Sequence, residues 1–441
     1  MSRAGAPDDP RLTDPLSIGD LTLRNRLYRA PLLECAGNGP DAAERLVAEL
    51  EPAAAAGAGL VCQGATIVRG EGGCAAPGMT RVHDDAFVAG LAEVPEACHA
   101  HGATVAVQLE HGGLRAMETW HAGHRAANPD LDQLAVSRPP APLRALDRLG
   151  FLEYSPHVMS TREVEELAAD FGRAARRAVD AGYDVVHVAG ANMGIVQQFL
   201  SPFYNRRDDR FADGVAFLEL VAEEVRDRVG DVPLTAKVPA ETSTPPLVAP
   251  DRITRERAVG ICARLAAGEF DALAPVSASV FWDMSIVRGS YPTEAWADDR
   301  FAEGYAEAFG SPLRARLVAL GNRIESLVYD FEPAWNADLC RAVRDVVDVP
   351  VLCEGGIRER PRIDRLLGDA CDAVGMGRPF YAEPRLPARL LDEADARAVC
   401  ESCNNCAVPQ AAGEPGVCRT PSVLRRAGDL RQAGAYDREE D

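Results

Sequence analysis

The chain has 441 residues, of which 47% are hydrophobic and 26% are charged; this is a globular composition and excludes a disordered or fibrous protein. The 47 basic and 67 acidic residues give a net charge of -20, which disfavours nucleic acid and anionic membranes as partners. No apolar run is long enough for a membrane-spanning helix, and the polar start MSRAGAPDDPRLTDP carries no signal-peptide core. We therefore expect a cytoplasmic protein.

Short apolar runs alternate with amphipathic stretches along the chain. The predicted strands are 27–31, 59–68, 104–109, 184–190, 234–238, 272–279, 350–356 and 373–377. The predicted helices are 41–56, 85–101, 162–181, 214–229, 254–268, 334–347 and 359–367. Strands that alternate with helices pair in parallel through right-handed crossovers. The pattern predicts an α/β fold, a closed (β/α)8 TIM barrel, with a doubly wound open sheet as the alternative.

Two long segments, residues 114–160 and 280–332, interrupt this alternation. Loops of this length are usually functional, and in a barrel they lie at the carboxyl ends of the strands, where the chemistry takes place. We interpret both as lid insertions, with plain surface coverings as the alternative. The predicted organisation is a barrel domain over residues 1–395 and a small cysteine-rich segment over residues 396–441.

Four of the 12 cysteines are crowded near the C-terminus, namely Cys400, Cys403, Cys406 and Cys418. Three closely spaced thiolates can reach one cube-shaped cluster that a distant fourth thiolate closes. Tetrahedral zinc usually uses two C-x2-C pairs, and the second pair is missing here. The spacing favours a [4Fe–4S] cluster and leaves zinc as the alternative.

Glycines and an arginine follow the last two predicted strands. Gly355 and Gly356 come after the seventh strand, and Gly377 and Arg378 come after the eighth. Loops in these two places usually form the phosphate site of a barrel. Glycine lets backbone amides approach a phosphate closely, and arginine adds charge-assisted hydrogen bonds. The pattern predicts phosphate binding rather than two tight turns.

Other predicted strands end in polar residues. Gln108 ends the third strand and can both donate and accept, which suits a pyrimidine-like edge; His111 follows it. Lys237, the single lysine of the chain, ends the fifth strand and should face an anion or a developing anion. His187 lies on the fourth strand, where a packed histidine is the alternative to a catalytic one. Asn192 follows that strand and could donate to a substrate oxygen.

Several motifs in order resemble the old yellow enzyme superfamily of NADH:flavin oxidoreductases. They are LTLRNRLYRAP at the first strand, QLEHGG at the third, QFLSPxxNxR after the fourth and VGMGRPFYAEPxLP at the eighth. With the four cysteines, the chain is most similar to the iron–sulfur branch, which includes 2,4-dienoyl-CoA reductase and trimethylamine and histamine dehydrogenases. The resemblance spans about residues 15–421.

The resemblance implies an FMN cofactor in the barrel, beside the cluster. It places FMN against Ala30, Pro31, Leu33, Gly64, Gln108, Lys237, Gly355, Gly356, Gly377 and Arg378. Within this set, Gln108 would bond the pyrimidine, Lys237 would stand where the family usually has arginine beside N1 and O2, and the last four residues would hold the phosphate. Leu33 replaces the usual threonine or cysteine. The cluster would lie at the dimethylbenzene edge and pass single electrons.

The substrate-binding residues depart from the family pattern. Ala189 stands in place of the first residue of the usual polarising pair, and only Asn192 remains of that pair. Gly194 stands in place of a proton-donating tyrosine. The catalytic candidates are therefore Asn192, His187 and His111.

We expect an FMN- and [4Fe–4S]-dependent oxidoreductase that moves a hydride between flavin N5 and a small organic substrate, by enoyl or dienone reduction or by amine oxidation. No G-x-G-x-x-G motif is present, so the nucleotide-binding domains of many iron–sulfur members are expected to be lacking. Electrons would then pass to a separate electron-transfer protein or come from NAD(P)H at the flavin. The alternatives are a catalytically silent electron-transfer or scaffold protein and a zinc-stapled non-redox barrel enzyme. A homo-oligomer is left open.

Overall fold

The computed structural model describes residues 10–148, 152–242, 251–280 and 283–437. Residues 149–151 of the first predicted insertion and 281–282 of the second lie outside the described residues. So do 1–9 and 243–250 of the predicted barrel domain and 438–441 of the predicted C-terminal segment.

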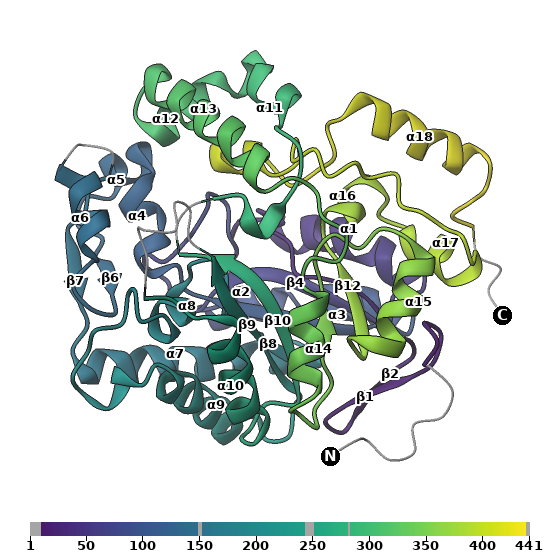
Figure 1. The fold of residues 1–441 in the computed structure, drawn as a ribbon, viewed down its shortest axis with the longest axis horizontal. Helices are drawn as coiled ribbons and strands as arrows, with labels where there is room; N and C mark the ends of the chain where they lie inside the picture. The colour runs from purple at the N-terminus through teal and green to yellow at the C-terminus, as the bar shows by residue number, and fades with distance from the viewer. Residues whose placement is uncertain (1–9, 149–151, 243–250, 281–282, 438–441) are drawn as a thin grey trace.

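Eight parallel strands occupy the centre of the molecule, in the order β10-β9-β8-β5-β4-β3-β12-β11 (Figure 1). A bridge between Leu273 of β10 and Val351, next to β11, closes the ring. The strands are β3 (Leu27–Arg29), β4 (Leu60–Ile67), β5 (Thr104–Glu110), β8 (Val185–Val188), β9 (Leu234–Thr242), β10 (Ala272–Ser279), β11 (Leu352–Cys353) and β12 (Ala373–Met376). All eight predicted strands are present and the predicted TIM barrel is confirmed; the open sheet is excluded.

Helices on the outside of the barrel follow its strands. They are α1 (Ala42–Ala55), α2 (Asp85–Gly90), α3 (Glu93–His99), α7 (Thr161–Asp180), α8 (Ile195–Leu200), α9 (Val215–Val229), α10 (Arg255–Ala266), α14 (Ala337–Arg344) and α15 (Arg360–Asp369). The helix predicted over 85–101 is two helices. Pro95 has no N–H and would clash with the carbonyl group of Leu91 in a continuous helix, so the helix breaks before it.

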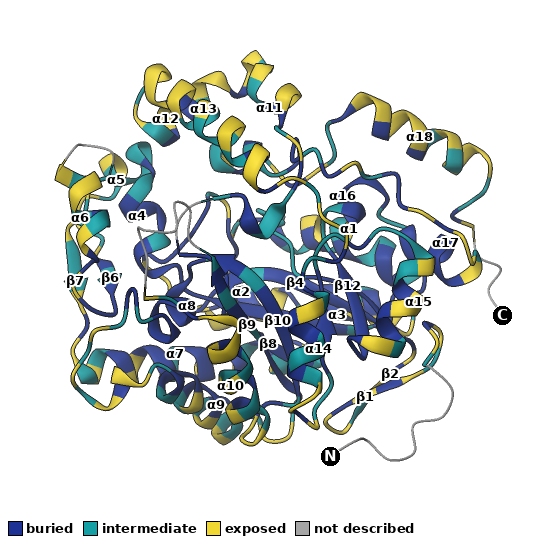
Figure 2. Ribbon diagram, in the orientation of Figure 1, coloured by how far each residue is buried: buried dark blue, intermediate teal, exposed yellow. Residues whose placement is uncertain are grey.

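The core lies on both sides of the strands. Strands are dark blue in Figure 2, whereas the outward faces of the helices are yellow. Inside the ring, small and medium side chains such as Ala106 and Ala274 pack with Leu16, Ile18 and Leu23. These three belong to a hairpin of β1 (Leu16–Ile18) and β2 (Leu21–Leu23), which therefore closes the amino-terminal end of the barrel.

Both predicted insertions contain short regular elements. The first has α4 (Met117–Trp120), α5 (Ala122–Ala127), α6 (Ala141–Arg148), and the parallel strands β6 (Gln133–Ala135) and β7 (Pro156–Val158). The second has α11 (Thr293–Ala297), α12 (Ala302–Phe309) and α13 (Pro312–Val328). The rings of Trp120 and Phe309 lie 6.1 Å apart, so the two insertions meet.

The C-terminal segment crosses the same side of the barrel as α11, α12 and α13 (Figure 1). It follows α16 (Arg378–Ala382) and α17 (Leu386–Asp392), and it contains the 3₁₀ turn Val408–Ala412 and α18 (Pro421–Gln432). Among the described residues, no helix has the length and apolar character needed to cross a membrane.

A fully buried arginine joins the first barrel strand to its surroundings. Arg29 of β3 pairs with Glu34 at 2.8 Å and with Glu49 of α1 at 3.1 Å, and it donates to the carbonyl oxygen of Cys62 in β4. Glu34 also accepts the amide hydrogen of Gly64 at 3.0 Å. The network thus holds the loop that follows β3 against β4.

We expect Arg29→Leu to lower the free energy of unfolding by about 3–5 kcal/mol, because it leaves two carboxylates without their buried partner. The measurement is urea unfolding at equilibrium. The control is Arg45→Leu on α1, which removes an exposed pair with Asp41 and should cost less than about 1 kcal/mol. Equal losses in the two variants would contradict the special role of Arg29.

Candidate active site

A cavity opens at the carboxyl ends of the barrel strands and holds about 1740 Å³ of empty space, including its mouth. Nine of the ten residues that the resemblance assigns to FMN line it: Ala30, Pro31, Leu33, Gln108, Lys237, Gly355, Gly356, Gly377 and Arg378. The tenth, Gly64, lies next to Ala65, which does line it. The barrel therefore brings the predicted cofactor residues together around one space.

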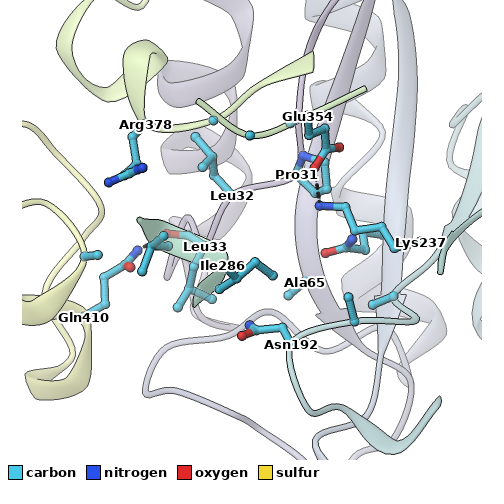
Figure 3. Close-up of a pocket in the computed structure, with 18 of the residues that line it drawn as sticks. Pro31, Leu32, Leu33, Ala65, Asn192, Lys237, Ile286, Glu354, Arg378 and Gln410 are labelled. Atoms are coloured by element: carbon cyan, nitrogen blue, oxygen red, sulfur yellow. Dashed lines mark hydrogen bonds and ion pairs between the residues drawn. The ribbon is translucent and has the colours of Figure 1, made fainter. Parts of the chain in front are cut away.

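Lys237 has a partner inside the protein. Its Nζ lies 2.6 Å from Oε2 of Glu354, and Oε1 of Glu354 accepts a hydrogen bond from the hydroxyl group of Tyr28 at 3.0 Å. Burial and the neighbouring carboxylate raise the pKa of Tyr28 well above its usual value, so this tyrosine is a donor. Figure 3 shows the Lys237–Glu354 pair on one wall of the cavity. The sequence predicted an anion for Lys237 but did not identify Glu354, whose only signal is its position just before the glycine pair.

The glycine pair after β11 is required by the local packing. Gly355 and Gly356 have φ values of 97° and 68°. A Cβ atom at Gly355 would lie 2.6 Å from the ring of Trp335, and one at Gly356 would lie 2.2 Å from the carbonyl oxygen of Glu332. The amide groups of Gly355, Gly356 and Gly377 donate to no backbone acceptor among the described residues. They are therefore available to an anionic group in the cavity.

A second space adjoins this cavity under the two insertions. It holds about 1680 Å³ and shares Arg115, Trp120, Asn192 and Asp283 with the first. Most of its other lining residues come from the two insertions, and they include Arg125, Trp296, Phe309, Arg314 and Leu317. The insertions thus wall an approach to the cofactor cavity, as their interpretation as lids requires.

Asn192 lines both spaces, and Figure 3 shows its side chain in the first. With its amide oxygen turned toward Arg115, that oxygen lies 3.1 and 3.2 Å from the two terminal guanidinium nitrogens. Arg115 makes no ion pair with a carboxylate of the described residues; burial lowers its pKa, and Glu110 opposes this. The sequence singled out Asn192 but missed Arg115 and Glu110, which line the cavity from the turn after β5 and from the end of β5.

His111 and His187 lie in the protein interior, and neither is among the residues that line either space. Burial lowers the pKa of each to about 3, so both imidazoles are neutral. Nδ1 of His187 lies 2.7 Å from the hydroxyl oxygen of Thr235. This geometry matches the packed alternative for His187, and a catalytic role for either histidine stays a prediction.

The four C-terminal cysteines line one small cavity of about 290 Å³, and none of them forms a disulfide. Sγ of Cys403 lies 2.9 Å from the hydroxyl oxygen of Thr420, and the amide of Ser402 donates to Sγ of Cys400 at 3.5 Å. Burial raises the pKa of Cys406 to about 12 and that of Cys418 to about 11. In the described part of the chain, no three His, Cys, Asp or Glu side chains are grouped so that they could hold a metal ion.

The cysteine cavity and the cofactor cavity share a wall. Arg378, Tyr381 and Ser402 line both. The guanidinium of Arg378 donates to the side-chain oxygen of Asn404, between two of the cysteines, and to the carbonyl oxygen of Arg288.

The C-terminal segment is also tied to the loop after β3. The hydroxyl group of Tyr381 and the side-chain amide of Gln410 donate to the carbonyl oxygen of Leu33, at 3.0 and 2.6 Å. Figure 3 shows Gln410 reaching this loop. Neither Tyr381 nor Gln410 was singled out from the sequence, because no short motif indicates a contact between residues more than 300 positions apart.

The model of the NADH:flavin oxidoreductase / NADH oxidase family matches residues 11–262. The chain belongs to this family, and it is a flavin-dependent oxidoreductase. It is 27% identical to 4,4'-dithiodibutanoate disulfide reductase of Rhodococcus erythropolis, over 96% of this chain and 98% of that enzyme. It is 25% identical to NADH oxidase of Thermoanaerobacter brockii, over 90% of this chain but only 53% of that protein.

Solved structures share the fold. Histamine dehydrogenase from Rhizobium sp. 4-9 matches with a TM-score of 0.69 and 19% identity, over 94% of this chain and 53% of that one. Morphinone reductase matches with a TM-score of 0.60 and 23% identity, over 92% and 96%. This chain therefore spans about half the length of some relatives and nearly the full length of others.

The cofactor cavity fits FMN. Orphan amides and Arg378 suit its phosphate, Gln108 offers a donor and an acceptor for the pyrimidine, and Lys237 offers a positive charge. The Lys237–Glu354 pair also means that the charge of Lys237 is partly balanced before any cofactor is bound.

We expect Lys237→Met to lower the midpoint potential of bound FMN, because the variant loses a positive charge that favours the reduced, more negative flavin. Glu354→Gln should raise the potential, because it leaves the charge of Lys237 unbalanced. Spectroelectrochemical titration of the FMN-loaded variants measures both. Shifts of the same sign, or none, would exclude an electrostatic role of this pair.

Proposed function

We propose that this protein is an FMN- and [4Fe–4S]-dependent oxidoreductase that moves a hydride between the flavin and a small organic substrate and exchanges single electrons through the cluster. The observation that carries the proposal is the wall of Arg378, Tyr381 and Ser402 between the cofactor cavity and the cysteine cavity. FMN in one cavity and a cluster in the other would both adjoin this shared wall. Bound FMN supplies the hydride chemistry, and the protein supplies binding, orientation and electrostatics.

The cysteine cavity supports a polynuclear cluster better than zinc. A single zinc ion needs four ligands within about 2.3 Å of one point, whereas the four cysteines line a cavity of about 290 Å³ and, in the described structure, are not grouped closely enough to hold one ion. A cluster of several iron and sulfide ions fills such a space, and each thiolate binds a different iron. The raised pKa values of Cys406 and Cys418 mean that iron must displace their protons on binding.

Arg115 supports an anionic substrate. Its guanidinium lies between the two adjoining spaces and has no carboxylate partner among the described residues. A partly buried cation at a cavity wall favours a carboxylate, which accepts charge-assisted hydrogen bonds. The relative from Rhodococcus erythropolis, matched over nearly its whole length, is named for a disulfide that bears two carboxylates. We therefore propose a carboxylate-bearing acceptor, and we keep amine oxidation as the alternative direction because of the fold shared with histamine dehydrogenase.

The source of the electrons is part of the same proposal. NAD(P)H would reduce the flavin directly, or a separate electron-transfer protein would exchange electrons at the cluster. Cys400, Cys403 and Cys418 are partly exposed, which supports exchange with a partner at that surface. A cytoplasmic location and a homo-oligomer remain predictions from the sequence.

Anaerobically purified protein should release FMN on denaturation and contain about four iron and four sulfide per chain. Cys406→Ser should lose iron and sulfide but keep FMN, because Cys406 lines only the cysteine cavity. Cys262→Ala, which changes a buried cysteine of α10, should keep all three. One zinc per chain without sulfide would exclude the cluster, and protein without flavin would exclude the whole proposal.

Arg115→Met should raise the KM for 4,4'-dithiodibutanoate about tenfold or more, because a hydrogen bond to a charged group contributes roughly 1.5–3 kcal/mol. The KM for a neutral acceptor, 2-cyclohexenone, should change little. Steady-state kinetics with NADH as donor measure both values. An equal rise for both acceptors would show that Arg115 maintains the shape of the cavity and does not bind an anion.

A further inference from the structure

Glu110 is a buried acid at the cofactor cavity that no motif singles out. It is the last residue of β5 and is only 4% exposed. Alternate residues of a strand point to the same face, and Gln108 and Glu110 both line the cavity while Leu109 packs in the core. Glu110 therefore lies one strand repeat, about 7 Å, beyond the residue assigned to the pyrimidine, toward the space under the insertions.

The carboxyl group of Glu110 is not used by the fold. Its Oε1 is buried and has no hydrogen-bond partner among the described residues. A buried polar atom without a partner costs about 1–3 kcal/mol, and no group of the described residues offsets this cost at Glu110, whose side chain lines the cofactor cavity.

Gly194 provides the room for this carboxyl group. Its φ of -61° and ψ of 171° are accessible to any residue, so the backbone does not require glycine there. A Cβ atom at Gly194 would lie 3.1 Å from Oε1 of Glu110. Any larger residue at Gly194 would press on the carboxyl group or displace it.

The charged and titratable groups around Glu110 come from three other segments. They are Arg115 from the turn after β5, Lys237 from β9 and Cys74 from the loop after β4. No group lies close enough to form an ion pair with Glu110 in the described structure. Burial raises the pKa of Glu110, and Arg115 and Lys237 only partly oppose this effect.

We propose that Glu110 is the acid–base residue of the reaction and exchanges a proton directly with the substrate. The inference rests on the proposed hydride transfer, and it identifies Glu110 as the source of the proton that accompanies the hydride. In the reducing direction, one substrate atom gains the hydride, with both electrons from the reduced flavin, and a neighbouring atom gains the proton of Glu110. The carboxylate that remains is protonated again by water, so the substrate is reduced by two electrons and the flavin is oxidised by two. In the oxidising direction the carboxylate takes the proton.

The pH dependence follows from the direction of the pKa shift. In the unfolded chain a glutamic acid releases its proton at about pH 4.3, whereas in the folded protein Glu110 keeps its proton to a higher pH. Glu110 therefore contributes its full free energy to stability below about pH 4.3, and this contribution is lost as the pH rises through the raised pKa. The ability of Glu110 to donate a proton should be lost over the same pH range.

The test uses the FMN-loaded holoenzyme, Glu110→Gln and the control Glu118→Gln. Glu118 is also buried, at 3% exposure, but it lines neither space and lies 3.4 Å from His124. Infrared difference spectra against pH report the protonated carboxyl group without any turnover. Single-turnover reoxidation of the reduced enzyme is then followed with 4,4'-dithiodibutanoate, which takes up protons, and with ferricyanide, which takes only electrons.

We expect a protonated-carboxyl band that persists above the ordinary pKa of a glutamic acid, about 4.3, and that Glu110→Gln removes and Glu118→Gln retains. Reoxidation by the disulfide should slow about 100-fold or more in Glu110→Gln, while reoxidation by ferricyanide should not change. Absence of the band, or equal slowing with both acceptors, would overturn the role of Glu110. A wild-type enzyme that ferricyanide reoxidises but that passes hydride neither to the disulfide nor to 2-cyclohexenone would instead overturn the proposed hydride transfer, and the role of Glu110 with it.

Discussion

The buried cluster of Arg29, Glu34 and Glu49 is the constraint on which the active-site end of the barrel depends. Arg29 is fully buried at the end of a short part of the ring, where β3 pairs with β4 through only two residue pairs. Few backbone hydrogen bonds join β3 to β4 here, and the guanidinium of Arg29 adds others. It bonds Glu34 in the following loop, Glu49 of α1 and the carbonyl oxygen of Cys62 in β4. Glu34 also accepts a hydrogen bond from the amide of Gly64. This bond fixes the position of the loop after β3 beside the cofactor cavity.

That loop is in turn the anchor for the C-terminal segment. Tyr381 and Gln410 both bond the carbonyl oxygen of Leu33, and Arg378 bonds Asn404 within the cysteine loop. The cysteine cavity is thereby held against the barrel by side chains that also wall the cofactor cavity. The proposed coupling of two redox groups thus depends on the same contacts that fold the segment onto the barrel.

Some charged side chains of the cavity have a partner of opposite charge, and others do not. Lys237 is paired with Glu354, and Glu354 with Tyr28, so these charges have partners before a cofactor binds. Arg115 contacts the side chain of Asn192 but no carboxylate, and Oε1 of Glu110 has no hydrogen-bond partner among the described residues. Desolvation makes a buried group without a partner costly. Arg115 also lines the space under the insertions, which distinguishes the substrate side of the cavity from the cofactor side.

The sequence by itself determined the barrel, since eight apolar strands separated by amphipathic helices leave few other ways to bury both faces of a sheet. It also determined the cofactor residues near strand ends, such as Gln108, Lys237 and Arg378, because position along a parallel strand fixes the end at which a side chain lies. Only the tertiary structure decided the partners of these residues. Glu354 pairs with Lys237 of another strand, and Glu110 and Arg115 line the cavity from the end of β5 and the turn after it. Contacts between separate segments leave no periodic signal in the chain. For the same reason, the placement of His111 and His187 behind the wall could not be read from strand alternation, which does not show which face lines the interior.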